Sequence, residues 1–324
     1  MKTNLAPFTL LISGLLASSC ATAQPTPPAP QGRIYTFQSD ASGFNTQTHF
    51  FDDGREVVAF DAQFTPELAR KAIAYLRTQT PHPIRTLVIL HPNPDKFNGL
   101  SAFQEIGAQV IASRRTVEAM PGVHAYKKYF FVHMAHMFTD ENYPPLGKVD
   151  RVFDEKLEIR TANGQLIELT ELGTPGVSSN QTVAEIPTLP AVLVGDLIHS
   201  HVHAWLEGGI VDGKAKPELA SWISQLKWLR NRGKAIPGAR VFAGRGESSE
   251  LETAVNEQIA YLRTAEQIVT GYLKDLGDRR SELVGPTAQI HYSALQAEFE
   301  KRFPHHGLGY MIGYGVYGLV NSKL

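Results

Sequence analysis

The 324-residue sequence predicts an α/β fold, and two kinds of segment carry this prediction. Three short apolar runs, at 84–90, 189–196 and 239–246, are too continuous to alternate between core and solvent, which is typical of strands buried on both faces. Two longer segments, 216–233 and 251–276, place apolar residues at helical spacing along one stripe. Buried strands that alternate with amphipathic helices indicate a sheet with helices packed against it.

The first residues have the pattern of a secretory signal followed by a linker. Residues 1–23 combine a lysine, an apolar core too short to span a bilayer and the small-x-small sequence "ATA", so we expect cleavage after Ala23. The Pro-rich segment 24–33 is expected to be an extended linker. The alternative is a lipoprotein anchored at Cys20, because "ASSC" loosely resembles a lipobox. The protein is therefore expected to be periplasmic or secreted.

The composition narrows the range of partners. The 31 Lys and Arg residues balance 32 Asp and Glu residues, so the sequence predicts neither nucleic acid nor an anionic membrane surface as the main partner. No membrane span is predicted after the signal. Cleavage after Ala23 would remove the only cysteine, which would leave no disulfide and no thiolate ligand. A small-molecule ligand or substrate is expected, and the oligomeric state is not predicted.

The remaining elements follow in order from about Arg33. A hairpin is predicted over 48–64 with its turn at Asp53 and Gly54, and Thr65 followed by Pro66 opens a helix. After the first buried strand, "SAFQEIG" and "QVIAS" indicate a helix and then a strand.

The second half of the chain has equally regular signals, after one segment without any. Residues 120–148 are aromatic and show no clean period, so no element is assigned there. A second hairpin is predicted over 152–169, turning at Asn163 and Gly164. We expect one domain over 34–285, with 286–324 as a helical, aromatic tail packed on it.

Three polar loops follow the three buried strands, and together they carry a resemblance. They read "HPNPDKFNG", "GDLIHS" and "AGRGE", and "LGTPGVSS" precedes the second. Their order and spacing resemble the metallo-β-lactamase superfamily, whose motifs are His-x-His-x-Asp-His, Gly-His-Thr-Pro-Gly, an Asp at a strand end and Gly-His-Gly. The resemblance covers about residues 34–250. It implies an αββα sandwich of two mixed β-sheets flanked by helices, with metal ions at one sheet edge.

Some metal-ligand positions match the family. His91 matches the first metal-binding His, Asp95 the Asp of the first motif, and Asp196 the carboxylate that bridges two metals. These three residues are the possible but incomplete metal ligands that the resemblance implies.

The other positions depart from the family. Asn93 and Lys96 stand where the second and third His are expected, and Gly173 and Arg245 replace the remaining two. Four of the five histidines are therefore missing. Since a zinc ion in such enzymes needs three protein ligands and an open position for water, the retained residues would make a poor zinc site.

The nature of two replacements predicts what takes the place of the metal. Lys96 and Arg245 bring permanent cations next to Asp95 and Asp196, and a buried carboxylate needs a positive partner. We therefore expect a salt-bridged cluster that also repels a dication. Asp95, Lys96 and Arg245 are the candidate catalytic residues of a metal-free centre, and Asn93, Lys96 and Arg245 the candidate substrate-binding residues. A lysine flanked by two carboxylates holds its proton tightly, which makes Lys96 a poor base.

A relocated metal site is the alternative. "GDLIHSHVHAW" supplies His199, His201 and His203 just after Asp196, and in a strand the three rings would share a face. A site built from His91, Asp196 and either His199 or His203 would hold a single zinc or iron. Otherwise no cofactor is expected.

Two functions follow from these expectations. The first is an exported hydrolase-like protein acting on an ester, lactone, amide or thioester, with an altered metal centre. The second is a non-catalytic binding protein, a pseudoenzyme that uses the cations of the former metal site to hold an anionic ligand. Family resemblance favours the hydrolase, whereas the residues speak against the usual dinuclear zinc chemistry.

Overall fold

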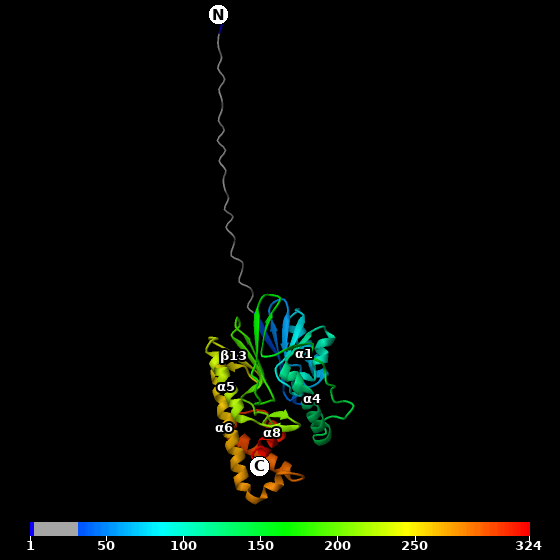
Figure 1. The fold of residues 1–324 in the computed structure, drawn as a ribbon, viewed down its shortest axis with the longest axis vertical. Helices are drawn as coiled ribbons and strands as arrows, with labels where there is room; N and C mark the ends of the chain where they lie inside the picture. Colours follow the sequence, from blue (N-terminus) through cyan, green and yellow to red (C-terminus); the bar gives the residue numbers. More distant parts are fainter. Residues whose placement is uncertain (3–31) are drawn as a thin grey trace.

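A computed structural model describes residues 1–2 and 32–324 of the chain (Figure 1). The signal peptide predicted over 1–23 and the linker predicted over 24–33 lie outside the described residues, apart from their first two and last two positions. None of the described helices is both long enough and apolar enough to cross a membrane.

The first sheet has six strands in the order β1-β2-β3-β4-β5-β6. Their bounds are β1 (Arg33–Gln38), β2 (Gln47–Asp52), β3 (Val57–Phe60), β4 (Ile84–Ile89), β5 (Gln109–Ser113) and β6 (Arg151–Phe153). The strands β1 to β3 pair antiparallel, whereas β3 to β6 pair parallel, so the sheet is mixed. The β2–β3 pair confirms the hairpin predicted at Asp53 and Gly54.

The second sheet is also mixed and has the order β14-β13-β10-β9-β8-β7. Its strands are β7 (Lys156–Arg160), β8 (Leu166–Glu171), β9 (Thr182–Ile186), β10 (Ala191–Ser200), β13 (Arg240–Gly246) and β14 (Ser249–Glu250). Only β10 and β13 run parallel, and the β7–β8 pair confirms the hairpin at Asn163 and Gly164. A separate two-stranded ribbon contains β11 (Gly209–Val211) and β12 (Lys214–Lys216).

The helices lie on the outside of the sheets. They are α1 (Pro66–Gln79), α2 (Pro94–Phe97), α3 (Leu100–Glu105), α4 (Arg114–Tyr129), α5 (Leu219–Gly233), α6 (Leu251–Leu276), α7 (Ala288–Arg302) and α8 (Tyr310–Asn321), with 3₁₀ turns at Ala41–Gly43 and Gly277–Leu283 and a π-helical turn at Phe130–Met134. Thr65 caps α1 through its side chain, which accepts a hydrogen bond from the Leu68 backbone, and Pro66 occupies the first turn, as predicted.

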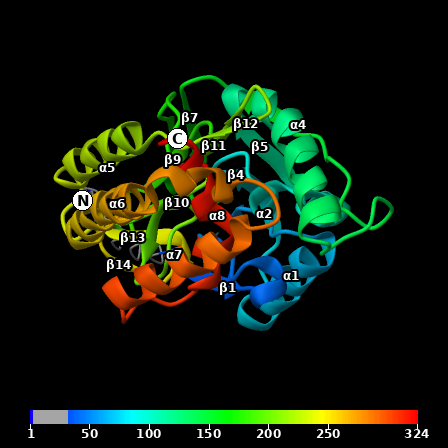
Figure 2. The same ribbon diagram turned by 90° about the horizontal axis from the view of Figure 1, so that it is seen from below.

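The two sheets pack face to face, and helices cover both outer faces (Figure 2). Val88 and Leu90 point into the core between the sheets, whereas Leu87 and Ile89 pack against α1 and α3. This arrangement confirms that the first apolar run is buried on both faces. Since α5 and α6 cover the second sheet, the fold is the αββα sandwich that the resemblance implied.

Two details differ from the sequence prediction. The strand predicted to end at Asp196 continues to Ser200, because register shifts after Leu193 and Gly195 let β10 bulge and keep its pairing with β13. The unassigned segment 120–148 begins with the end of α4 and the π-helical turn. Its irregularity has a physical cause, since Pro121 lies inside the helix and the π turn breaks the helical period.

The C-terminal helix α8 packs closely on the loop after β10. Ile312, Val316 and Leu319 are buried in the same core as α5 and α6. A Cβ on Gly318 would lie 2.5 Å from the Glu207 carbonyl oxygen, so only glycine lets the helix approach this closely. The loop that follows β10 is thereby held in one place beside the site described next.

Candidate functional site

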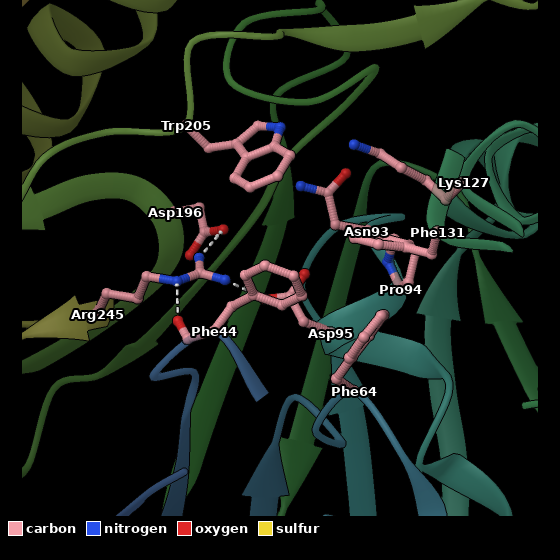
Figure 3. A pocket seen from close by; sticks show the side chains of 10 residues that line it. All are labelled: Phe44, Phe64, Asn93, Pro94, Asp95, Lys127, Phe131, Asp196, Trp205 and Arg245. Atoms are coloured by element: carbon pink, nitrogen blue, oxygen red, sulfur yellow. Dashed lines mark hydrogen bonds and ion pairs between the residues drawn. The ribbon is translucent and has the colours of Figure 1, made fainter. Parts of the chain in front are cut away.

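Four charged side chains, Asp95, Lys96, Asp196 and Arg245, meet at one edge of the sheets, and Figure 3 shows three of them, Asp95, Asp196 and Arg245. Asp95 and Lys96 lie in the short helix α2 directly after β4, Asp196 lies in the bulged part of β10, and Arg245 lies in β13. All four are buried, and the exposed fraction of Lys96 is 0%. Sequence analysis predicted that these four residues would come together.

The two cations are ion-paired with both carboxylates. Lys96 Nζ lies 3.0 Å from Asp95 Oδ2 and 2.9 Å from Asp196 Oδ1. Arg245 donates from Nη2 to Asp95 Oδ2 at 2.7 Å and from Nη1 to Asp196 Oδ2 at 2.6 Å. Each carboxylate therefore has two positive partners, and the predicted salt-bridged cluster is present. We call these four residues the ion-pair cluster.

The loop before β2 completes the ion-pair cluster, and sequence analysis missed it. Arg245 donates from Nε to the Phe44 carbonyl oxygen at 2.8 Å and from Nη2 to Thr46 Oγ1 at 3.0 Å. The Thr46 hydroxyl in turn donates to Asp95 Oδ2 at 2.8 Å. Both Phe44 and Asn45 have positive φ angles, 58° and 51°, which non-glycine residues seldom adopt, so the loop is strained where it meets the guanidinium.

The charges in the ion-pair cluster shift one another's pKa values. Burial by itself would raise the pKa of Asp95, but the charges of Lys96 and Arg245 outweigh it and lower the pKa to about 2. The pKa of Asp196 is held well below its usual value for the same reason. Burial opposes the charged form of Lys96, yet Asp196 and Asp95 outweigh it and raise the pKa of the ammonium. All four groups are therefore ionised at neutral pH, and their charges cancel.

Two glycines make room for the ion-pair cluster. A Cβ on Gly244 would lie 2.0 Å from Asp196 Oδ1 and 2.8 Å from Lys96 Nζ, so a side chain there would enter the ion pair itself. Gly195 has a φ of 53° within the bulge, and its own Cβ would lie 2.8 Å from the His91 ring. The bulge turns Asp196 into the cluster, which is a common use of a β-bulge near a functional site.

His91 lies next to the cluster without belonging to it. Its Nε2 is 3.5 Å from Asp196 Oδ2, and within the described part of the chain neither ring nitrogen makes a hydrogen bond. Asp61, which sequence analysis missed, follows β3 and accepts a hydrogen bond from the Leu90 backbone at 2.9 Å. Burial raises the pKa of Asp61 to about 6, although the Lys96 charge opposes the shift. The only sequence signal for Asp61 was its place after a strand.

The remaining motif positions carry no charge. Asn93 precedes α2, and its Oδ1 accepts a long hydrogen bond from the Ser178 hydroxyl at 3.4 Å. Gly173 has a φ of 71°, and its amide donates to Glu171 Oε1. The glycine that stands where the family has a His therefore serves the local turn.

The histidines after Asp196 lie in different surroundings, and the relocated metal site stays a prediction. His201 has a φ of 54° and ends the strand geometry, so the three rings do not share a face. His199 is buried near Trp222, and burial lowers its pKa to about 3. His203 is buried against Tyr261 and Phe299 instead.

A small cavity opens beside the ion-pair cluster, and four aromatic rings and Pro94 supply the apolar part of its wall. It is lined by Phe44, Phe64, Asn93, Pro94, Asp95, Lys127, Phe131, Asp196, Trp205 and Arg245 (Figure 3). Its volume is about 30 Å³, enough for one or two water molecules. Lys127, which is buried and ion-paired with Glu207, holds its ammonium 4.7 Å from the Trp205 ring. The second cation at the cavity is therefore also neutralised.

The donor set does not fit a zinc ion. The three oxygens of Asp95 and Asp196 that face inward are taken by Lys96 and Arg245. A dication placed there would meet two fixed positive charges at ion-pair distance. In the described ranges no three His, Cys, Asp or Glu side chains are arranged to hold a metal ion.

Comparison with known proteins finds likeness in structure alone. No family model matches the sequence, and no curated protein matches it. A metallo-β-lactamase from Pontibacter korlensis aligns with a TM-score of 0.53 at 18% identity, covering 74% of this chain and 97% of that one. The DIM-1 metallo-β-lactamase, in a structure of the enzyme exposed to ceftazidime, aligns with a TM-score of 0.51 at 16% identity, covering 73% and 99%. TMB-1 aligns with a TM-score of 0.50 at 17% identity, covering 72% and 94%.

Proposed function

Because the chain has the metallo-β-lactamase fold while cations fill the place of its metals, we propose a metal-independent, non-catalytic binding protein. One observation carries the proposal: Lys96 and Arg245 are both paired with Asp95 and Asp196, the carboxylates that would hold metal ions. Hydrolysis in this fold depends on a metal-activated water, and the site offers neither the free ligands nor the electrostatic potential for one. We also propose that the protein is exported, because residues 1–23 have the pattern of a secretory signal.

The ligand class follows from the cavity wall. Anion binding by the former metal site, the ligand expected from sequence, has little support, since both cations are saturated by internal carboxylates. The apolar part of the wall includes the rings of Phe44, Phe64, Phe131 and Trp205, which favours a small apolar or aromatic ligand. Such a ligand needs roughly 300 Å³ or more. We propose that movement of the strained loop at Phe44 supplies that room.

Two measurements test the proposal. We expect no hydrolysis above the buffer rate for ester, lactone, amide and thioester substrates, with added zinc or with a chelator. Indole is the binding probe, measured by calorimetry, and the matched variant is Asn93→Phe, which fills the cavity from its rim. We expect indole to bind the unaltered protein and not Asn93→Phe, with equal melting temperatures.

The hydrolase is the competing function. Turnover that requires zinc and disappears in Asp196→Asn would overturn the proposal and favour an altered mononuclear centre. Equal indole binding by the unaltered protein and Asn93→Phe, or binding by neither, would refute the assignment of the cavity as a ligand site.

A further inference from the structure

Two histidine-bearing segments far apart in sequence lie side by side below the second sheet. The His203 amide donates to the Gly307 carbonyl at 2.9 Å, and the Gly307 amide donates to the His201 carbonyl at 2.9 Å. A parallel bridge joins Val202 to Gly307. This pairing holds the sequence "HVH", at 201–203, beside "HHG", at 305–307. The sequence of either segment alone does not predict that they are neighbours.

His203 has the surroundings of a metal ligand. The side chain is buried, and its Nδ1 lies 3.1 Å from the Tyr261 hydroxyl. That hydroxyl already accepts a hydrogen bond from the Ala204 amide at 3.2 Å, which fixes its position. Within the described residues the other ring nitrogen, Nε2, is buried without a hydrogen-bond partner. A ring held through one nitrogen while the other presents a free position is the usual arrangement of a histidine that binds metal.

The rings of His203 and His201 each lie near the ring of His306. The ring centroids of His203 and His306 are 5.6 Å apart, and those of His201 and His306 are 6.5 Å apart. Since Zn–N bonds measure about 2.0–2.1 Å, two imidazoles on one ion have their centroids roughly 5 Å apart. His306 is half-buried and stacks on the Tyr261 ring, with 5.5 Å between centroids, so its position is restrained.

Only the exposed His201 ring has to rotate to complete a three-ligand site. His201 is exposed, and its Nε2 now faces Glu257 Oε2 at 3.5 Å. Within the described residues no three ligand side chains are arranged around one point as they stand, so the proposed site requires His201 to turn. A rotation about the side-chain bonds of an exposed histidine costs little and would bring a third nitrogen to the two restrained ones.

We propose that His201, His203 and His306 form a site for one zinc-like dication, with water or Glu257 as the fourth ligand. The site shares no residue with the ion-pair cluster and is independent of the proposed function. Bound metal would clamp the "HHG" segment, and with it the start of α8, to the loop after β10.

Zinc and cobalt titrations of the full chain test the site. We expect one ion per chain, with Co²⁺ producing the visible absorption of a tetrahedral nitrogen site. His201→Gln should weaken binding roughly 10–100-fold without affecting folding, since His201 is exposed, and His203→Gln should do the same or more. The matched control is His305→Gln, an exposed neighbour outside the site, which should bind like the unaltered protein.

The variants separate the possible outcomes. Failure to bind zinc at millimolar concentration, or equal binding by His201→Gln and the unaltered protein, would overturn the site. Zinc that is retained in His201→Gln and lost in Asp196→Asn would lie in the ion-pair cluster, and would overturn this inference and the metal-independent function together. Zinc lost in His201→Gln and retained in Asp196→Asn would support the inference and leave the proposed function standing.

Discussion

Removal of the Lys96 ammonium is the most direct test of the ion-pair cluster. Lys96→Met keeps the length of the side chain but leaves Asp95 and Asp196 with Arg245 as their one cation. At 2.9 and 3.0 Å, each lost pair is worth about 5–6 kcal/mol at an effective dielectric constant of about 20. Part of that gain is offset in the native protein because burial of the ammonium itself costs several kcal/mol.

The net loss should be about 3–5 kcal/mol in the free energy of unfolding, the range measured when one partner of a buried pair is removed. Urea unfolding followed by circular dichroism measures it directly, and the melting temperature should fall by roughly 5–8 °C. Lys128→Met is the matched control, because Lys128 pairs with Asp140 at a comparable 2.9 Å but in solvent. Its stability should change little.

A second substitution shows whether the loss of stability in Lys96→Met comes from the missing charge. Asp95→Asn added to Lys96→Met removes the excess negative charge, so the double variant should be more stable than Lys96→Met alone, with a coupling free energy of about 1–3 kcal/mol. A loss in Lys96→Met no larger than in Lys128→Met would refute the reasoning. So would a double variant whose losses simply add.

Two further predictions concern the surroundings of the cluster. Burial lowers the pKa of His49 from its usual value to about 4. Between pH 6.5 and pH 4 the unfolded chain therefore binds a proton that the folded protein does not bind. The free energy of unfolding should fall by up to about 3 kcal/mol as the pH drops through this range. Urea titrations at several pH values should show a smaller fall for His49→Gln, and identical pH profiles would contradict the prediction. Gly244→Ala should cost at least about 1–3 kcal/mol, because its Cβ would lie 2.0 Å from Asp196 Oδ1, whereas Gly122→Ala in α4, with no neighbouring atom within 4 Å, should be neutral or slightly stabilising. Equal melting temperatures for the two alanine variants would rule out the close approach at Gly244.

Local sequence patterns predicted the elements that depend on local forces. The apolar run at 84–90 predicted a strand with two buried faces, and the stripe over 251–276 matches α6 to the residue. The predicted end of this strand at Asp196 was wrong, because the bulge that extends β10 to Ser200 depends on pairing with β13 and no local pattern reveals that pairing. The C-terminal helices α7 and α8 were expected only as a helical tail, since glycines at three positions of α8 mask its helical signal.

The charged part of the site was predictable, and the remainder was not. Asp95, Lys96, Asp196 and Arg245 could be placed together because the resemblance assigns all four to metal-ligand positions, and the opposite charges must then neutralise one another once buried. Thr46 and the Phe44 carbonyl contribute through a left-handed turn that lies some 200 residues from Arg245 in sequence. The cavity wall combines rings from four separate segments, and their convergence depends on tertiary packing alone.

The geometry also explains why cations can replace metal in this fold without loss of the fold. The ligands of a metal at this edge come from loops of both sheets, so the ion ties the two sheets together. Here Asp95 and Lys96 follow a strand of the first sheet, whereas Asp196 and Arg245 belong to the second. Two ion pairs, Lys96 with Asp196 and Arg245 with Asp95, therefore join one sheet to the other. The ion pairs between the sheets therefore connect them as a metal ion would. The proposed non-catalytic function agrees with this arrangement, because an ammonium and a guanidinium have no open coordination position at which a water molecule could be activated.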